Sequence, residues 1–554
     1  MLTRLSGGKI FDPEHGVDGT VGDLFIEDTR IVADPGPQAT IDRDYDLSNK
    51  IVMAGAIDLH THIGGGKTNL ARALLPEDHR AELAERTLLT RSGSGHCSPS
   101  TFITGYRYAE MGYTACFEPA MLPSNARQAH FEMGDTPIID KGAYAMLGND
   151  DFLLRLLRDG APQQRINDYV AWTLDALQAI GIKVVNPGGI SAFKFNQRAL
   201  DVDQPNAHYG ITPRAIVKAL TRALHELGVP HPLHVHASNL GVPGNADSTL
   251  ETMRAAEGLP IHVTHIQFHS YGTEGERKFS SAAARIAEAV NAHQNVSIDV
   301  GQIAFGQTVT CSGDTMSQHR QAHHGDPKKA VIMDIECDAG CGVVPFRYRD
   351  RNFVNALQWA IGLEIFLLTK DPWRVFLTTD HPNGAPFTHY PTLVRLLTDR
   401  TYRNDMLAQI HPDAAAMSNL KGLDREYTLY EIAIMTRAAP ARILGLADRG
   451  HLGAGACADV VVYNDEPNRE AMFARPTYVF KNGELVARDG HVVKATWGDT
   501  HVVKPAFDRG IEHDLNTYFE RYQTVRMENF RIGADEMHDI GRGAGLQVHP
   551  CRNG

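Results

Sequence analysis

Eight short apolar stretches alternate with segments of helix-like spacing along most of this 554-residue chain. The intervening segments, such as 166–180 and 351–368, repeat their apolar residues three or four positions apart, as amphipathic helices do. A strand–helix unit repeated eight times predicts an α/β fold, a closed (β/α)₈ barrel of the TIM type. Chemistry in such a barrel lies at the C-terminal ends of its strands. The predicted strands are 51–62, 113–121, 143–149, 181–186, 232–237, 260–266, 296–300 and 374–380.

The two ends of the chain differ from its middle. Residues 1–50 and 446–504 contain strand-like pieces separated by turns. The simplest arrangement is a small composite β-sandwich domain built from both chain ends, which leaves residues 51–445 for the barrel. Residues 505–554 form a polar extension with scattered aromatic residues. We expect this extension either to pack on the barrel as helices or to dock onto a partner subunit.

Two histidines end the first predicted strand. His60 and His62 follow the apolar run 54–59 and stand two positions apart. Side chains at that spacing point to the same side of a strand, so both imidazoles can reach one metal ion. A satisfied polar pair in the core is the alternative for an isolated motif of this kind. The recurrence of candidate ligands at the ends of later strands favours a metal site.

The fourth predicted strand places Lys183 inside an apolar run, just before a turn. A buried amine is costly unless it is paired or neutral. One interpretation is a lysine that forms a salt bridge or extends its amine to solvent. The other is a lysine that loses its proton, captures carbon dioxide as a carbamate and bridges two metal ions.

Three later strands supply further candidate ligands. His234 and His236 share one face of the fifth strand. His262 and His265 are separated by an odd number of positions, so we expect them on opposite faces of the sixth strand, with only one inside the barrel; His265 is nearer the strand end. Asp380 ends the eighth strand, where a lone aspartate is otherwise often a helix cap.

These side chains together offer nitrogen and oxygen ligands and no thiolate, which suits Zn²⁺. Two ions sharing a lysine carbamate and a hydroxide would lie about 3.5–4 Å apart and would lower the pKa of the bound water toward roughly 7. The predicted ligands are His60, His62, Lys183, His236, His265 and Asp380.

Three stretches of the chain resemble motifs of the amidohydrolase superfamily. Residues 54–62 resemble its Pro-Gly-x-Ile-Asp-x-His-x-His signature, with Ala54 in place of the proline. Residues 436–446 resemble its penultimate helix, and residues 450–461 resemble the strand that enters its β domain. The likeness covers roughly residues 5 to 500.

Within that superfamily, residues 183–189, 234–241 and 264–272 resemble the family of formylmethanofuran dehydrogenase A subunits, which includes those of methylotroph formyltransferase/hydrolase complexes. The resemblance implies hydrolysis, or formation, of the N-formyl amide of a methanofuran- or methylofuran-type C1 carrier. Formate and the free furfurylamine-type cofactor would be the products, and the chain would be the hydrolytic subunit of a larger complex. It also implies that the six predicted ligands bind two Zn²⁺ and that Asp380 is both ligand and general base.

Several alternatives stay open at this point. Lys194 is a second candidate for the N6-carboxylysine, and His234 could replace His236 if the strand register is shifted by two. A second function is a stand-alone amidohydrolase of cyclic amides or N-acyl amino acids, similar to dihydropyrimidinases or aminoacylases. A third is a metal-free scaffold subunit.

Composition excludes several classes of function. The seven cysteines form no framework, and the closest pair, Cys337 and Cys341, is separated by three residues; we expect neither an iron–sulfur cluster nor molybdopterin in this chain. A net charge of -12 argues against nucleic-acid binding. Neither an apolar run of membrane-spanning length nor a signal-peptide core is present, so we expect a cytoplasmic protein.

Overall fold

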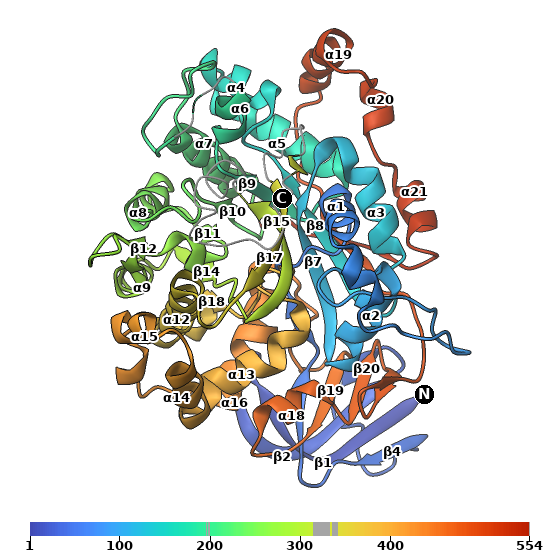
Figure 1. Ribbon diagram of the computed structural model, residues 1–554. Coiled ribbons are helices and arrows are strands. Elements are labelled where there is room, and N and C mark those ends of the chain that lie inside the picture. The colour runs from blue at the N-terminus through green and yellow to red at the C-terminus, as the bar shows by residue number, and fades with distance from the viewer. Residues whose placement is uncertain (195–196, 198–199, 314–332, 335–341, 553–554) are drawn as a thin grey trace.

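The computed structural model describes residues 1–194, 197, 200–313, 333–334 and 342–552. At its centre, eight parallel strands follow one another around a barrel with helices on the outside (Figure 1). The first and last meet through a parallel bridge between Thr61 and His381, and the His62 N–H donates to the His381 carbonyl at 2.8 Å. This closes the predicted (β/α)₈ barrel. In order, the strands are β6 (Ala56–Asp58), β7 (Tyr113–Met121), β8 (Asp140–Met146), β9 (Gly181–Val185), β10 (Leu233–His236), β11 (Ile261–Val263), β14 (Val296–Asp299) and β18 (Val375–Phe376).

The outer helices bury one apolar face against these strands. In α7, Thr212 caps the N-terminus by accepting the Ala215 N–H at 3.2 Å, and Pro213 suits the first turn. Ile216 and Leu220 of the same helix are fully buried. The main helices are α2 (Thr101–Glu110), α3 (Ala126–Gly134), α5 (Gln163–Leu177), α7 (Pro213–Glu226), α8 (Ala246–Ala255), α9 (Ala283–Ala292), α12 (Phe353–Leu368) and α17 (Ala439–Leu444).

The predicted first strand, 51–62, is divided between two sheets. Residues Lys50–Ala54 form β5 of the terminal sheet, whereas β6 begins at Ala56 in the barrel. Gly55 stands at the junction, where an added Cβ would lie 2.1 Å from Oγ1 of Thr114. The expectation of one continuous strand was wrong here, because an apolar run does not reveal where the backbone leaves one sheet for the next.

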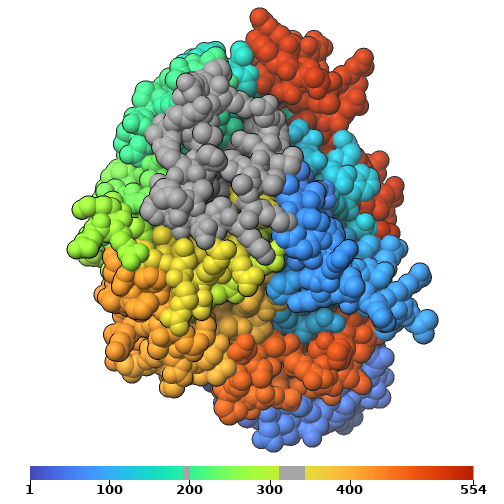
Figure 2. All heavy atoms as spheres, viewed as in Figure 1, coloured from blue at the N-terminus to red at the C-terminus, as the bar shows by residue number. Residues whose placement is uncertain are grey.

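A second sheet joins the two ends of the chain at one end of the molecule (Figure 2). It bends at β1, whose first half pairs with β4 and whose second half pairs with β5. The parts of the sheet on either side of this bend face each other across an apolar core, where the Tyr45 ring lies 5.3 Å from that of Tyr478. This is the predicted composite β-sandwich; the exact boundaries between domains stay a prediction. Its strands are β1 (Leu2–Asp12), β2 (Val17–Glu27), β3 (Arg30–Val32), β4 (Arg43–Asp46), β5, β19 (Val460–Asn464), β20 (Tyr478–Lys481), β21 (Glu484–Arg488) and β22 (His491–Val492).

A buried charge cluster joins the barrel to the composite sheet. Oδ2 of Asp140, at the start of β8, lies 2.9 Å from Nζ of Lys481 and 3.0 Å from Nε of Arg449. Its other oxygen accepts the N–H of Asp499 at 2.8 Å. Lys481 and Arg449 hold the pKa of Asp140 well below its usual range, although burial alone would raise it. One carboxylate of β8 is therefore tied to three points of the later segment 449–499.

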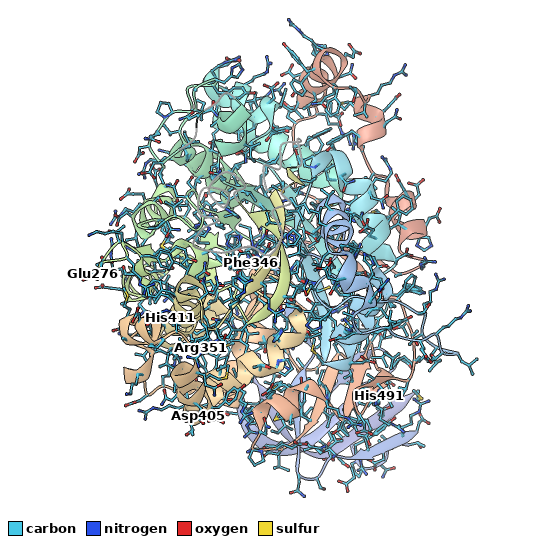
Figure 3. All side chains as sticks on the ribbon, viewed as in Figure 1. Glu276, Phe346, Arg351, Asp405, His411 and His491 are labelled. Atoms are coloured by element: carbon cyan, nitrogen blue, oxygen red, sulfur yellow. The ribbon has the colours of Figure 1, made fainter. Side chains whose placement is uncertain are left out.

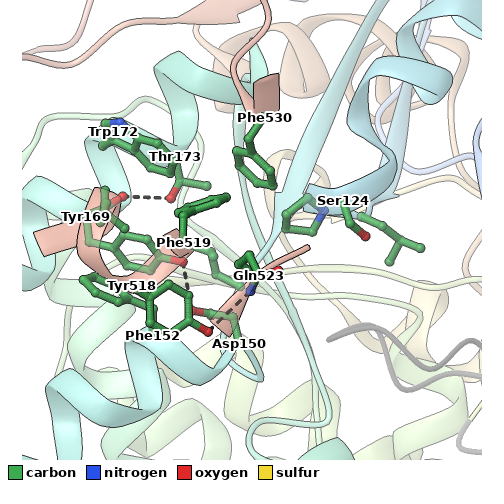
Figure 4. A pocket seen from close by; sticks show the side chains of 14 residues that line it. Ser124, Asp150, Phe152, Tyr169, Trp172, Thr173, Tyr518, Phe519, Gln523 and Phe530 are labelled. Carbon is green, nitrogen blue, oxygen red and sulfur yellow. Dashed lines mark hydrogen bonds between the residues drawn. The ribbon is translucent and has the colours of Figure 1, made fainter. Parts of the chain in front are cut away.

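The C-terminal extension packs on the barrel. β23 (Thr500–Val503) pairs with β8 and with β24 (Leu546–His549), and the helices α19 (Gly510–Tyr522), α20 (Met527–Phe530) and α21 (Ala534–Ile540) lie between them in sequence. The Phe530 ring stacks on Trp172 of α5 at 5.9 Å. A cavity of about 70 Å³ remains between the extension and the barrel, and six of its fourteen lining residues are aromatic (Figure 4). Docking of this extension onto a partner stays a prediction.

A three-stranded sheet lies in front of the barrel strands, beside α1 (Gly66–Leu74), and contains Phe346, which Figure 3 labels. It consists of β15 (Gly306–Gly313), β16 (Met333–Asp334) and β17 (Gly342–Tyr348). The Tyr348 hydroxyl donates to the carbonyl of Asn383 at 3.1 Å, and that of Thr308 donates to the carbonyl of Pro382. The sheet thereby fixes the loop that follows β18.

In the described ranges, none of the helices has both the length and the apolar composition needed to cross a bilayer. Cys337 and Cys341 lie outside the described residues.

Candidate metal centre

His60, His62 and Asp380 meet where β6 and β18 end. Oδ1 of Asp380 lies 2.7 Å from Nε2 of His60 and 3.5 Å from Nε2 of His62. All three side chains are buried, and their ligand atoms lie close enough to share one ion. Burial alone would raise the pKa of Asp380, but His60 and His265 hold it well below its usual range. This carboxylate is therefore ionised at neutral pH.

A second group of imidazoles lies beside the first. The ring centroid of His265 is 4.6 Å from that of His236, 5.3 Å from that of His269 and 5.6 Å from that of His60. Within the described part of the chain, neither ring nitrogen of His236, His265 or His269 has a hydrogen-bond partner. Burial lowers the pKa of all three, to about 3 for His269. Neutral, buried imidazoles with free nitrogens are suited to bind a metal ion.

Lys183 joins these groups from β9. Its side chain is fully buried, and Nζ lies 3.5 Å from Nε2 of His60. Lys194, the other lysine considered, is the last residue of α6 (Gly189–Lys194), and its side chain lies outside the described residues.

His234 and His236 occupy the same face of β10 at different depths. Nε2 of His234 lies 2.8 Å from Nδ1 of His60, and its Nδ1 lies 3.0 Å from Nε2 of His231. Both nitrogens of His234 thus have neighbouring ring nitrogens, one on His60 and one on His231. His236 is the last residue of β10, where its ring contacts that of His265.

His262 and His265 both lie inside the barrel, so the expectation of opposite faces was wrong. Nε2 of His262 lies 3.0 Å from Oδ2 of Asp299, and the His265 N–H donates to Oδ1 of the same carboxylate at 2.7 Å. β11 ends at Val263, and His265 has a φ of +34°. This left-handed turn breaks the alternation of faces, so His265 turns inward as well.

Sequence reasoning missed three buried carboxylates that surround these ligands. Asp58 accepts the Tyr108 hydroxyl at 2.8 Å, and burial raises its pKa to about 6. Glu118 of β7 lies 3.0 Å from Nδ1 of His62, and Asp299 of β14 lies 3.3 Å from Nδ1 of His60. Each interrupts an apolar stretch of a predicted strand, which is the signal that drew attention to Lys183. His269 lies within the motif of residues 264–272 but was not predicted as a ligand.

The chain belongs to the amidohydrolase family, whose sequence model matches residues 44–493. Membership implies a binuclear metal centre, and the histidine groups described above could hold it. The A subunit of the formyltransferase/hydrolase complex Fhc of Methylorubrum extorquens is 44% identical over 537 residues, which cover 96% of each chain. Protein FwdA of Methanocaldococcus jannaschii is 40% identical over 551 residues, which cover 95% of this chain and 96% of that protein.

A solved structure is similar over the whole chain. It is the crystal structure of the formyltransferase/hydrolase complex FhcABCD from Methylorubrum extorquens in complex with methylofuran. One of its chains matches with a TM-score of 0.93 at 43% sequence identity, and the match covers 100% of both chains.

Proposed function

We propose that this protein hydrolyses, or forms in the reverse direction, the N-formyl amide of a methylofuran- or methanofuran-type C1 carrier, with formate and the free amine as products. Identities of 44% and 40% to the A subunit of Fhc and to FwdA over nearly the whole chain support this activity. The observation that carries it is the buried, ionised Asp380 placed between His60 and His62.

The proposed metal ligands are His60, His62, Lys183, His236, His265 and Asp380, and the proposed ions are two Zn²⁺. The donor set of nitrogen and oxygen without thiolate supports zinc. The free ring nitrogens of His236 and His265 support their assignment, and the filled hydrogen-bonding positions of His234 support His236 in its place. We propose that Lys183 is the carboxylated lysine, because its amine is buried beside His60.

Asp380 is proposed to carry the proton during the reaction. When bound, the metal ions would polarise the formyl carbonyl and activate water as the nucleophile. Asp380 would accept a proton from that water and return it to the departing amine nitrogen. Its Oδ1 accepts Nδ2–H of Asn383 at 2.8 Å, which fixes the carboxylate, while its backbone N–H donates to Oγ1 of Thr378 at 2.9 Å. The chain thus holds one ionised acid–base group against the ligand cluster.

We further propose that the chain works as the hydrolytic component of a heteromeric complex in the cytoplasm. Its likeness to a chain of FhcABCD over 100% of both lengths supports an equivalent place among other subunits. The substrate would be a formylated furfurylamine-type cofactor, as the methylofuran in that structure suggests. Neither molybdopterin nor an iron–sulfur cluster is proposed for this chain.

Asp380→Asn is expected to abolish turnover and retain much of the zinc, because the amide keeps an oxygen ligand but cannot accept the proton. General acid–base groups contribute about 10²–10⁴-fold to rate, so formate release should fall by at least that factor. The measurement is formate released from a formylated furfurylamine-type amide by the zinc-loaded chain with its partner subunits, together with zinc content by elemental analysis.

The same assay distinguishes the proposed substrate from others. Hydantoins and N-acyl amino acids are assayed as alternative substrates beside the formamide. Rapid turnover of those compounds without turnover of the formamide would contradict the proposed function. An active Asp380→Asn protein would remove the role assigned to that residue.

A further inference from the structure

The buried carboxylate of Glu118 makes hydrogen bonds that are not part of the backbone pairing of its strand. It lies in β7 with 1% of its surface exposed. Oε1 is 3.0 Å from Nδ1 of His62 and accepts the Ala120 N–H at 3.1 Å. Oε2 accepts the N–H groups of Ile63 at 2.7 Å and of Gly64 at 3.1 Å. One buried carboxylate therefore binds the ring of His62 and the backbone that follows it.

These contacts determine which nitrogen of His62 carries the proton. A carboxylate can only accept hydrogen bonds, so Nδ1 of His62 must be the donor, and in the neutral ring Nε2 then holds the lone pair. Nε2 is buried without a hydrogen-bond partner in the described part of the chain, and it faces Oδ1 of Asp380 at 3.5 Å. The ring thus presents a free lone pair toward the proposed metal position.

We propose that Glu118 is a positioning residue that fixes the tautomer and the orientation of His62, so that Nε2 is available to a metal ion. The inference rests on the proposed function for the role of His62. Carboxylates that hold the outer nitrogen of a ligating histidine in this way typically change metal affinity by about 10–100-fold when they are replaced.

The contacts to Ile63 and Gly64 extend the effect to the backbone. Ile63 and Gly64 lie between the end of β6 and α1. The carboxylate of Glu118 therefore binds both the ring of His62 and the backbone turn that positions this ring along the barrel axis. Both oxygens are fully used as acceptors. Removing the charge therefore cannot be compensated by rotation of the side chain.

Glu118→Gln gives a specific expectation because an amide has one acceptor and one donor end. If the amide oxygen keeps the N–H groups of Ile63 and Gly64, its NH₂ points at Nδ1 of His62 and at the Ala120 N–H. His62 then has to accept at Nδ1 and carry its proton on Nε2, where it cannot bind a metal. The opposite rotamer places the NH₂ against two backbone N–H groups.

The test compares Glu118→Gln with Glu364→Gln as a matched control. Glu364 is also fully buried and accepts the hydroxyls of Ser281 at 2.6 Å and Ser418 at 2.7 Å, outside the ligand cluster. The readouts are zinc affinity of the full chain by competition with a chelator and the visible absorption of the cobalt-loaded protein. We expect zinc affinity to fall about 10–100-fold and the cobalt spectrum to change in Glu118→Gln only.

Unchanged zinc affinity and an unchanged cobalt spectrum in folded Glu118→Gln would overturn the inference, as would equal losses in both variants. If Glu118→Gln does not fold, Glu118→Asp is used, whose shorter side chain withdraws the acceptor from Nδ1; wild-type zinc affinity there would also overturn it. Metal binding is measured without substrate. If the wild-type chain with its partner subunits holds zinc but releases no formate, while Glu118→Gln shows the expected zinc loss, the proposed function is contradicted and this inference stays intact.

Discussion

Asp380 and His265 share a backbone conformation that is uncommon for residues with side chains. Their φ angles are +50° and +34°. Each lies just beyond the regular part of a strand, where the left-handed turn directs the side chain into the barrel mouth. Such conformations cost of the order of 1–3 kcal/mol each and persist only where the surroundings fix them. Asp299 supplies that support for His265 by accepting its N–H, and Thr378 does so for Asp380.

The two histidines of β10 are expected to differ in their effect on metal binding. His236→Ala should reduce the zinc content of the purified chain, because it removes an imidazole whose nitrogens have no hydrogen-bond partner among the described residues. His234→Ala should retain zinc and lower thermal stability, since His234 lies between His60 and His231. Elemental analysis and thermal unfolding of both variants check this. Loss of zinc in His234→Ala with full retention in His236→Ala would reverse the ligand assignment.

At the scale of elements, the turn after β14 supports the turn after β11. Gly301 has a φ of +63°, and a Cβ added there would lie 2.5 Å from Cβ of His265 and 2.9 Å from its Cα. Gly301→Ala should therefore displace His265 and reduce both zinc content and formate release. Gly210→Ala is the matched control, because Gly210 has a φ of +71° and, among the residues that the structure describes, no neighbour within 4 Å of the added atom. Equal zinc loss in the two variants would indicate backbone strain alone.

The sequence predicted which segments form strands better than it predicted where each strand begins and ends. Eight apolar stretches indicated the barrel because hydrophobic periodicity reports burial within an element. The same signal extended the first strand across Gly55, since the change of sheet there depends on contact with Thr114. It also placed His262 and His265 on opposite faces, because alternation holds only while the strand continues.

The site could be predicted only where spacing was informative. Strand periodicity indicated the pairs His60 with His62 and His234 with His236. The structure brings His60, His62 and His236 to one barrel mouth with Lys183 and Asp380. The partners of these side chains could not be assigned, because pairing Glu118 with His62 or Asp299 with His60 requires the arrangement of strands around the barrel.

At the scale of the whole molecule, Asp140 is a point where the barrel contacts the composite sheet and the segment that precedes β23. Its carboxylate contacts Lys481 and Arg449, both almost fully buried, and accepts the N–H of Asp499. A buried cation that loses its partner is costly because the low-dielectric interior replaces its hydration poorly. Asp459 is a second carboxylate of this joint, because its Oδ2 lies 2.9 Å from Nζ of Lys481 and 3.4 Å from Nε of Arg449.

Asp140→Asn is expected to lower thermal stability, because it removes one of two carboxylates that bind Lys481 and Arg449. Since Asp459 remains, the loss should be smaller than the about 3–5 kcal/mol that a buried charge without any partner costs. The native state holds the pKa of Asp140 well below its unfolded value of about 3.9, so this stabilisation is present at neutral pH and is lost as pH falls below about 4. Thermal unfolding at pH 7 and at successively lower pH values measures both effects. A difference between wild type and variant that grows on acidification would contradict this account.

The pairing of β5 with β19 has a consequence for how the polypeptide is made. Residues 50–54 emerge early from the ribosome, whereas residues 460–464 follow only near the end of translation. At about 5–20 residues per second, roughly 20–80 s separate the two. Throughout that interval the nascent N-terminal strands present an unpaired edge and an uncovered apolar face, which is the surface that holdase chaperones bind.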